Sequence, residues 1–236
     1  MPGSIRLFVP EALRPGLQVA ASPGQARYLG TVMRRAVGDR VRLFNGTDGE
    51  WSARIVQLGR DRAVLAVQEQ LREQAPDGPD IWLAFALLKR DATDLVVQKA
   101  TELGASAILP TLTERTNAAR VNHDRLIAIA TEASEQSERL SVPDVREPMT
   151  LDRLLARWPS GRTLFAAIER SEAPLLGRAD GPAALLVGPE GGWTEHERRT
   201  LLSQDFVAPV SVGRLVLRAE TACLAGLVLL QAGQGP

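Results

Sequence analysis

Cysteine, histidine and long apolar runs are scarce in this sequence of 236 residues, and each scarcity excludes a class of protein. The single cysteine, Cys223, cannot form an internal disulfide, and its apolar surroundings predict a buried thiol. The two histidines, His123 and His196, lie apart in polar stretches, so we predict no transition-metal site. No apolar run is long enough to span a membrane. The N-terminal sequence, MPGSIRLFVPEALRPG, lacks the apolar stretch of a signal peptide, and we expect a cytoplasmic protein.

The usual phosphate-binding motifs are missing as well. No G-x-x-x-x-G-K-[ST] occurs, and the glycine-rich loop near the C-terminus, Gly188-Pro189-Glu190-Gly191-Gly192, is not a G-x-G-x-x-G motif. Its carboxylate, Glu190, disfavours a polyphosphate and favours a neutral or positively charged ligand. Gly191 and Gly192 permit φ > 0 and close approach of a ligand to the backbone. Taken alone, the loop is explained about equally well as an ordinary strand-to-helix turn.

The surroundings of this loop predict an α/β ligand site. An apolar strand over 183–187 precedes it, and a helix follows with Thr194 as N-cap and Glu197 as its capping-box partner. A short strand over 209–212, a second glycine-bearing loop over 213–218 and an apolar helix from Glu220 complete the stretch. Two such loops at strand ends are typical of proteins that bind a small ligand.

Charge is distributed unevenly along the chain. Residues 1–72 contain 11 arginines and no lysine against 6 acidic residues, whereas the rest of the chain is acidic in balance. An uneven solvated surface is one explanation. A division between a nucleic-acid-binding domain and a catalytic domain is the other, and we favour it. The arginines that could neutralise phosphates lie on or near the predicted first helix and strands: Arg6, Arg27, Arg34, Arg35, Arg40 and Arg42.

The first 72 residues predict a small β-barrel. Strands are expected at 5–9, 40–44, 51–58 and 63–69, with a short helix over 23–33 capped by Ser22. Asn45-Gly46 and Asp48-Gly49 predict a hairpin turn between the second and third of these strands. The polar segment 73–79, which has two prolines, predicts a linker.

Residues 80–236 predict an α/β domain. Strands expected at 81–88, 107–112, 164–168 and 183–187 alternate with helices, which favours a parallel sheet with helices on both faces. The first of these helices is expected to have Asp91 as its N-cap and to be closed by Gly104. Arg115 follows the strand over 107–112, at the edge where open α/β sheets bind ligands.

Several segments together carry a family resemblance: LLVGPEGGWTEHE, VGRLVLRAETA, VQKATELG and EASEQSER. The chain resembles the bacterial 16S ribosomal RNA uracil-N3 methyltransferases of the RsmE type, in the SPOUT class of S-adenosylmethionine-dependent enzymes. The matched positions include Lys89, Asp94 and Glu102 in one segment and Glu132, Glu135, Gln136 and Arg139 in another. Arg27 stands where the family often has histidine, which weakens any specific role for that position.

The resemblance implies a PUA-like barrel followed by a SPOUT domain with a C-terminal trefoil knot, a homodimer, and methylation of N3 of a uridine in 16S ribosomal RNA. It implies that S-adenosylmethionine is bound by the two loops: Val187, Gly188, Pro189, Glu190, Gly191, Gly192, Val212, Gly213, Leu215, Leu217, Arg218 and Thr221. The expected RNA contacts are Arg6, Arg27, Arg34, Arg35, Lys89 and Arg139.

Two residues are candidates for the chemistry. Arginine stays protonated, so Arg115 could stabilise a uracil anion as N3 loses its proton. The general base is open: Glu220 is possible, although a carboxylate at the start of a helix also favours the helix dipole. A structural Arg115, in an ion pair with Glu114 or another nearby acidic residue, is the alternative. Ribose 2′-O-methylation and a non-catalytic role in ribosome assembly are the alternative functions.

Overall fold

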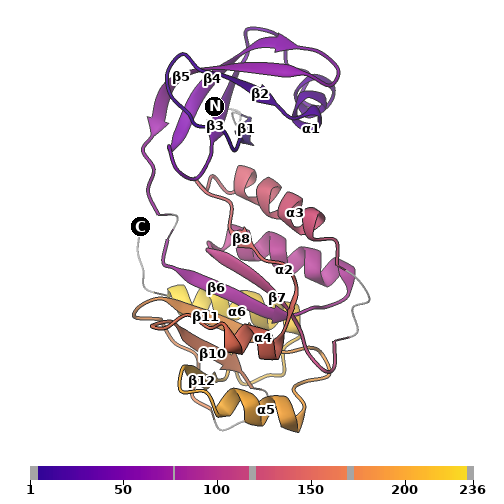
Figure 1. The fold of residues 1–236 in the computed structure, drawn as a ribbon, viewed down its shortest axis with the longest axis vertical. Coiled ribbons are helices and arrows are strands. Elements are labelled where there is room, and N and C mark those ends of the chain that lie inside the picture. Colours follow the sequence, from indigo (N-terminus) through magenta and orange to yellow (C-terminus); the bar gives the residue numbers. More distant parts are fainter. Residues whose placement is uncertain (1–4, 77, 117–120, 169–172, 233–236) are drawn as a thin grey trace. The chain divides into compact units, whose positions relative to one another are not determined.

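The computed structural model describes residues 5–76, 78–116, 121–168 and 173–232 and divides into two compact units (Figure 1). The first unit combines Met1–Asp77 with Ser134–Val142, and the second combines Gly78–Ala133 with Pro143–Pro236. The segment Ser134–Val142 therefore packs with the N-terminal residues, although it is distant from them in sequence.

The first unit contains a five-stranded mixed sheet with the strand order β1-β3-β4-β5-β2. β1 runs parallel to β3, and the other neighbours are antiparallel. The bounds are β1 Arg6–Phe8, β2 Gln18–Ala21, β3 Arg40–Phe44, β4 Glu50–Leu58 and β5 Ala63–Arg72. The predicted turn between β3 and β4 is present, with positive φ at Gly46 and Gly49. β2 was not predicted, because it has only four residues and ends directly before the Ser22 cap.

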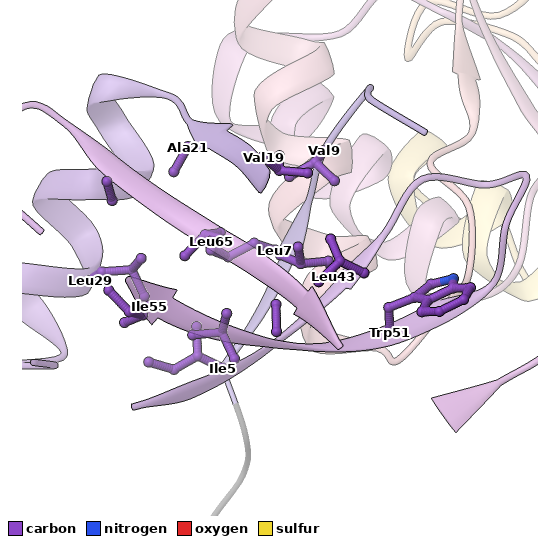
Figure 2. Packing of buried hydrophobic residues seen from close by; sticks show 14 of the residues in the cluster. Ile5, Leu7, Val9, Val19, Ala21, Leu29, Leu43, Trp51, Ile55 and Leu65 are labelled. Carbon is purple, nitrogen blue, oxygen red and sulfur yellow. The ribbon is translucent and has the colours of Figure 1, made fainter. Parts of the chain in front are cut away.

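Alternate side chains of these strands form the core of the first unit. Figure 2 shows Leu7, Leu43, Leu65 and Ile55 converging, and all four are buried. α1 (Pro23–Arg27) closes one end and continues as a π-helical turn, Tyr28–Val32. The predicted Ser22 cap is confirmed: its hydroxyl accepts from Gln25 N, and the Gln25 side chain accepts from Ser22 N.

The second unit contains a seven-stranded sheet with the order β12-β10-β11-β6-β7-β8, and β9 also pairs with β7. Every pairing in this sheet is parallel, which confirms the predicted sheet type. The bounds are β6 Ile81–Ala86, β7 Ala107–Leu112, β8 Asp144–Val145, β9 Met149–Thr150, β10 Thr163–Ala167, β11 Ala183–Val187 and β12 Val207–Val210.

Helices cover both faces of this sheet (Figure 1). Their bounds are α2 Arg90–Glu102, α3 His123–Gln136, α4 Leu151–Ala156, α5 Glu195–Leu202 and α6 Ala219–Gln231. Leu186 of β11 packs with leucines of α4 and α5, whereas its neighbour Leu185 meets α6 on the other face. A Cβ on Gly226 of α6 would lie 2.4 Å from Leu185 Cδ2, so this glycine permits close packing of helix and sheet.

The predicted start of α2 is wrong in detail. Lys89 is the N-cap, and Asp91 lies in the first turn, where a carboxylate favours the helix dipole. Gly104 ends the helix with φ 83°, as expected. Among the helices of the described residues, none is long and apolar enough to cross a membrane.

Candidate functional site

Three loops meet at the carboxyl edge of the parallel sheet. β11, β6 and β7 are neighbours in that order, with Val187 beside Phe85 and Phe85 beside Pro110. The segments that follow these strands are 188–194, 87–89 and 113–116, and they therefore leave the sheet at the same edge. This is the position at which open α/β sheets bind ligands.

A pocket of about 300 Å³ opens at this edge, lined by Leu87, Leu88, Lys89 and Glu190. The two leucines are buried and give it an apolar wall, whereas Lys89 and Glu190 are exposed and bring one charge of each sign. The buried hydroxyl of Thr93 donates to Leu88 O and accepts from Leu88 N, which fixes the backbone at the pocket wall. An apolar pocket with a few polar groups is typical of small-molecule sites.

The glycine-rich loop beside the pocket is held by a tight turn. Gly192 has φ 69° and its N–H donates to Pro189 O at 2.8 Å. The expected positive φ is thus present at Gly192 but absent at Gly191. Gly188 is required for a different reason: a Cβ there would lie 2.8 Å from the Trp193 ring, whose Nε1 donates to Ala167 O.

Arg115 lies against this loop. Its Nη1 donates to Gly191 O at 2.7 Å, and its Cδ would be 3.4 Å from a Cβ on Gly191. No ion pair with Glu114 is formed, and the other guanidinium N–H groups have no hydrogen-bond partner within the described ranges. The side chain is exposed, so these donors can reach a substrate.

The second loop, 211–218, presents apolar side chains to solvent. Leu215 is 80% exposed and Val216 is 66% exposed, whereas Leu217 and Val212 are half-buried. The Ser211 hydroxyl donates to Gly213 O and shapes the turn. The two exposed side chains are adjacent in sequence and provide apolar surface that a ligand could contact.

The first turn of α6 contains the remaining predicted site residues. Arg218 is the N-cap without a side-chain cap hydrogen bond, Thr221 is exposed and Glu220 is half-buried. Burial, aided by the negative charge of Glu220, raises the pKa of the Cys223 thiol far above its usual range. The side chain of Glu220 forms no hydrogen bond or ion pair with another described residue, so the structure gives no direct link between it and Arg115.

Two predicted RNA contacts need correction, because they are interior residues of the first unit. Arg6 is 6% exposed, and its Nε donates to Glu50 at 2.5 Å while its Nη atoms donate to Ser134 O, Glu135 O and Arg139 O. Arg139 is 7% exposed. A buried guanidinium cannot reach a phosphate at the surface. The prediction that Arg6 and Arg139 contact RNA is therefore wrong.

The other predicted arginines remain on the surface of the first unit. Arg27 forms an exposed ion pair with Asp61 at 2.7 Å. Arg34 is exposed and has φ 50°, and Arg35 is half-buried, with no hydrogen-bond partner for its Nε among the described residues. Arg40 is exposed on β3. These positions are compatible with phosphate contacts.

The sequence predicts Glu197 as the capping-box partner of Thr194, but it does not predict the hydrogen bond between Glu197 and Glu114. Glu197 Oε2 accepts from Thr194 N at 2.9 Å, as a capping box requires, and its Oε1 accepts from Glu114 N at 2.8 Å. Glu114 is 83 residues away, and no local signal predicts such a contact. The packing of Trp193 against Gly188 was also missed, and the Trp193 ring depends on a bond from its Nε1 to Ala167 O, 26 residues away.

Comparisons with known proteins agree with this architecture. Residues 76–231 match the RNA methyltransferase domain family, and residues 22–68 match the RNA methyltransferase PUA domain family. Ribosomal RNA small subunit methyltransferase E of Rickettsia conorii is 33% identical over 227 residues, which cover 94% of this chain and 93% of the relative.

Solved structures give the same result. Ribosomal RNA small subunit methyltransferase E of Neisseria gonorrhoeae, bound to S-adenosylmethionine, aligns with a TM-score of 0.88 and 31% identity over 97% of both chains. A methyltransferase of Legionella pneumophila in complex with the same cofactor aligns with a TM-score of 0.87 and 28% identity over 98% of both chains. This chain belongs to the RNA methyltransferase family that includes ribosomal RNA small subunit methyltransferase E.

Proposed function

We propose that this protein transfers the methyl group of S-adenosylmethionine to N3 of a uridine in the 16S RNA of the small ribosomal subunit. The observation that carries this proposal is Arg115 on Gly191, a cationic donor beside the loop that the family resemblance assigns to the cofactor. Relatives of this chain are named for methylation of small-subunit ribosomal RNA, which supports the substrate class.

The residues at the sheet edge suit the cofactor. A carboxylate, Glu190, lies beside the pocket and favours a cationic ligand, and Lys89 supplies a positive charge for a carboxylate or a phosphate. Leu215 and Leu217, from the second loop, are apolar surface for an adenine ring. When bound, S-adenosylmethionine supplies an activated methyl group as a sulfonium, so no metal is required.

Residues of the protein must promote loss of the proton on N3. An imide nitrogen is a poor nucleophile while protonated, so the site has to favour the anion and present the Watson–Crick edge of an unpaired base. Arg115 is our candidate for stabilising that anion, because its charge is permanent and its side chain is exposed. Glu220 remains our candidate for the general base, although a role in stabilising the first turn of α6 accounts for it equally well.

The first unit would supply RNA affinity. We propose that residues 1–72 form the RNA-binding domain, 73–79 a linker and 80–236 the methyltransferase domain. Surface arginines of the first unit, Arg27, Arg34 and Arg35, would contact phosphates, which position RNA without reading its sequence. The C-terminal knot and the homodimer belong to the proposal on the same family grounds.

Transfer of isotopically labelled methyl groups tests the proposal. The purified protein, incubated with labelled S-adenosylmethionine and small ribosomal subunits lacking the modification, should label the 16S RNA. Calorimetry on the same preparation should detect cofactor binding. Cofactor binding without transfer would indicate a non-catalytic RNA-binding protein instead.

A further inference from the structure

The carboxylate of Glu197 connects two loops of the site. Glu197 is the third residue of α5 and is 4% exposed. One of its oxygens accepts from Thr194 N at 2.9 Å, at the start of its own helix. The other accepts from Glu114 N at 2.8 Å, in the turn after β7. We call this pair of hydrogen bonds the Glu197 clasp.

A second bond joins the same two loops. The residue after Glu114 is Arg115, whose guanidinium donates to Gly191 O in the loop before α5. β11 and β7 are not neighbours, because β6 lies between them in the sheet. The clasp and the Arg115 bond therefore join two loops that flank the end of β6, where Leu87, Leu88 and Lys89 line the pocket with Glu190.

The chemistry of the clasp requires a carboxylate. The first unit contains another capping box, in which the third residue is a neutral glutamine, Gln25. There the amide oxygen accepts from Ser22 N and the amide nitrogen donates to Phe8 O. Both partners of Glu197 are N–H donors, so each of its two side-chain oxygens must be an acceptor, which glutamine cannot provide. Helix capping alone does not explain this choice of residue.

We propose that Glu197 is a positioning residue for methyl transfer: it holds the turn of Glu114 so that the Arg115 guanidinium faces the reacting base. This inference rests on the proposed function, in which Arg115 stabilises the uracil anion. A small misplacement of such a group costs up to about a hundredfold in rate. The effect of Glu197 on the rate should therefore act through Arg115 and vanish without it.

The test is a double-mutant cycle measured as single-turnover methyl transfer at saturating cofactor. Glu197→Gln should lower the rate on the order of tenfold or more, with cofactor affinity nearly unchanged. In an Arg115→Ala background, Glu197→Gln should lower it no further. Equal rate losses from Glu197→Gln in both backgrounds would overturn the inference and assign Glu197 a purely structural role.

A second pair of variants leaves α5 intact. Thr116 N donates to Thr113 O, so Glu114 is the second residue of a β-turn, a position that accepts proline. Glu114→Pro removes the N–H and should reproduce the rate loss of Glu197→Gln, whereas Glu114→Ala keeps the N–H, removes only an exposed side chain and should stay near the wild-type rate. Equal rates for Glu114→Pro and Glu114→Ala would contradict the inference. A wild-type protein that transfers no methyl would instead overturn the proposed function itself.

Discussion

Arg115 Nη1 donates a hydrogen bond to Gly191 O at 2.7 Å, across 76 residues of sequence. The bond joins the turn after β7 to the loop after β11, and no acidic partner competes for the guanidinium within the described ranges. Arg115 is thus held at the site by a neutral carbonyl, which leaves its positive charge uncompensated.

Arg115→Ala should lower the rate constant of methyl transfer by about a hundredfold, corresponding to a loss on the order of 3 kcal/mol of transition-state stabilisation. The melting temperature should change little, because the side chain is exposed. Arg115→Lys should restore only part of the rate, since an ammonium lacks the planar fork that holds Gly191 O while donating elsewhere. Single-turnover kinetics and thermal unfolding of each variant measure both quantities.

A structural arginine would give the reverse pattern. The melting temperature of Arg115→Ala would then fall while turnover per folded molecule stayed near the wild-type value. Cofactor affinity provides a third comparison: in our account it should change little in Arg115→Ala, because Arg115 acts on the base rather than on the cofactor.

Gly188→Ala should weaken cofactor binding strongly. The new Cβ would lie 2.8 Å from the Trp193 ring, which is fixed by its bond to Ala167 O, so the loop has to move. Gly181→Ala is the matched control, because a Cβ there meets no atom within 4 Å. Calorimetric titration with S-adenosylmethionine compares the two variants, and equal affinities would exclude this loop from the cofactor site.

Gly191→Val should also weaken cofactor binding, because a branched side chain would fill space beside the loop backbone that the cofactor is proposed to approach; backbone strain plays no part. Its φ is not positive, and its nearest neighbours are Arg115 Cδ at 3.4 Å and Cβ at 3.5 Å. A valine there would add two methyl groups beyond the Cβ, whereas Gly191→Ala adds only a Cβ at ordinary contact distance. We expect Gly191→Ala to retain most of the cofactor affinity in the same titration, and loss of binding in the alanine variant would contradict this explanation.

Much of the fold could be predicted from local patterns, because the features concerned are local. The apolar run of β11 and the capping box of Thr194 and Glu197 lie within a few residues of sequence, and both were located correctly. β2 escaped prediction because its residues QVAA alternate weakly, and its identity as a strand depends on pairing with β5.

Contacts between distant segments could not be predicted. Arg6 has the composition and sequence context of a surface arginine, yet it is buried by Glu50 and by backbone carbonyls more than a hundred residues away. The bonds from Glu197 to Glu114 and from Arg115 to Gly191 depend on strand order in the same way. The order of the strands in the sheet decides which loops are neighbours, and this order cannot be predicted from the sequence of a single loop.

Replacing Arg34 and Arg35 with glutamate should weaken RNA binding and reduce its dependence on salt, because fewer counterions are released from phosphates. The control is Arg153→Glu on α4 with Arg157→Glu at the C-cap of that helix, which makes the same change in net charge on exposed residues of the other unit. Fluorescence titration of labelled RNA across a salt series gives both affinity and slope. Identical slopes for the two double variants would show that Arg34 and Arg35 do not contact phosphates.

Cys223 should make stability depend on alkaline pH. Burial raises the pKa of this thiol in the folded protein, whereas in the unfolded chain it ionises near its usual value of about 8.5. Above that pH the unfolded chain loses the thiol proton while the folded protein keeps it. The free energy of unfolding is therefore unaffected by this group below that pH and falls above it, by up to about 1.4 kcal/mol per pH unit. Urea unfolding between neutral and alkaline pH measures the free energy of unfolding of the wild type and of Cys223→Ala. Its decrease with pH should be steeper in the wild type than in Cys223→Ala. Equal slopes would contradict the buried, protonated thiol.

The central claim, methyl transfer to N3 of uridine, is tested most directly by mass spectrometry of the nucleosides from 16S RNA treated with the protein and S-adenosylmethionine. Our account predicts that the added methyl appears as 3-methyluridine, and that Arg115→Ala forms it far more slowly than the wild type. A methyl group found on a ribose 2′-oxygen or on another base, with no 3-methyluridine, would contradict the account.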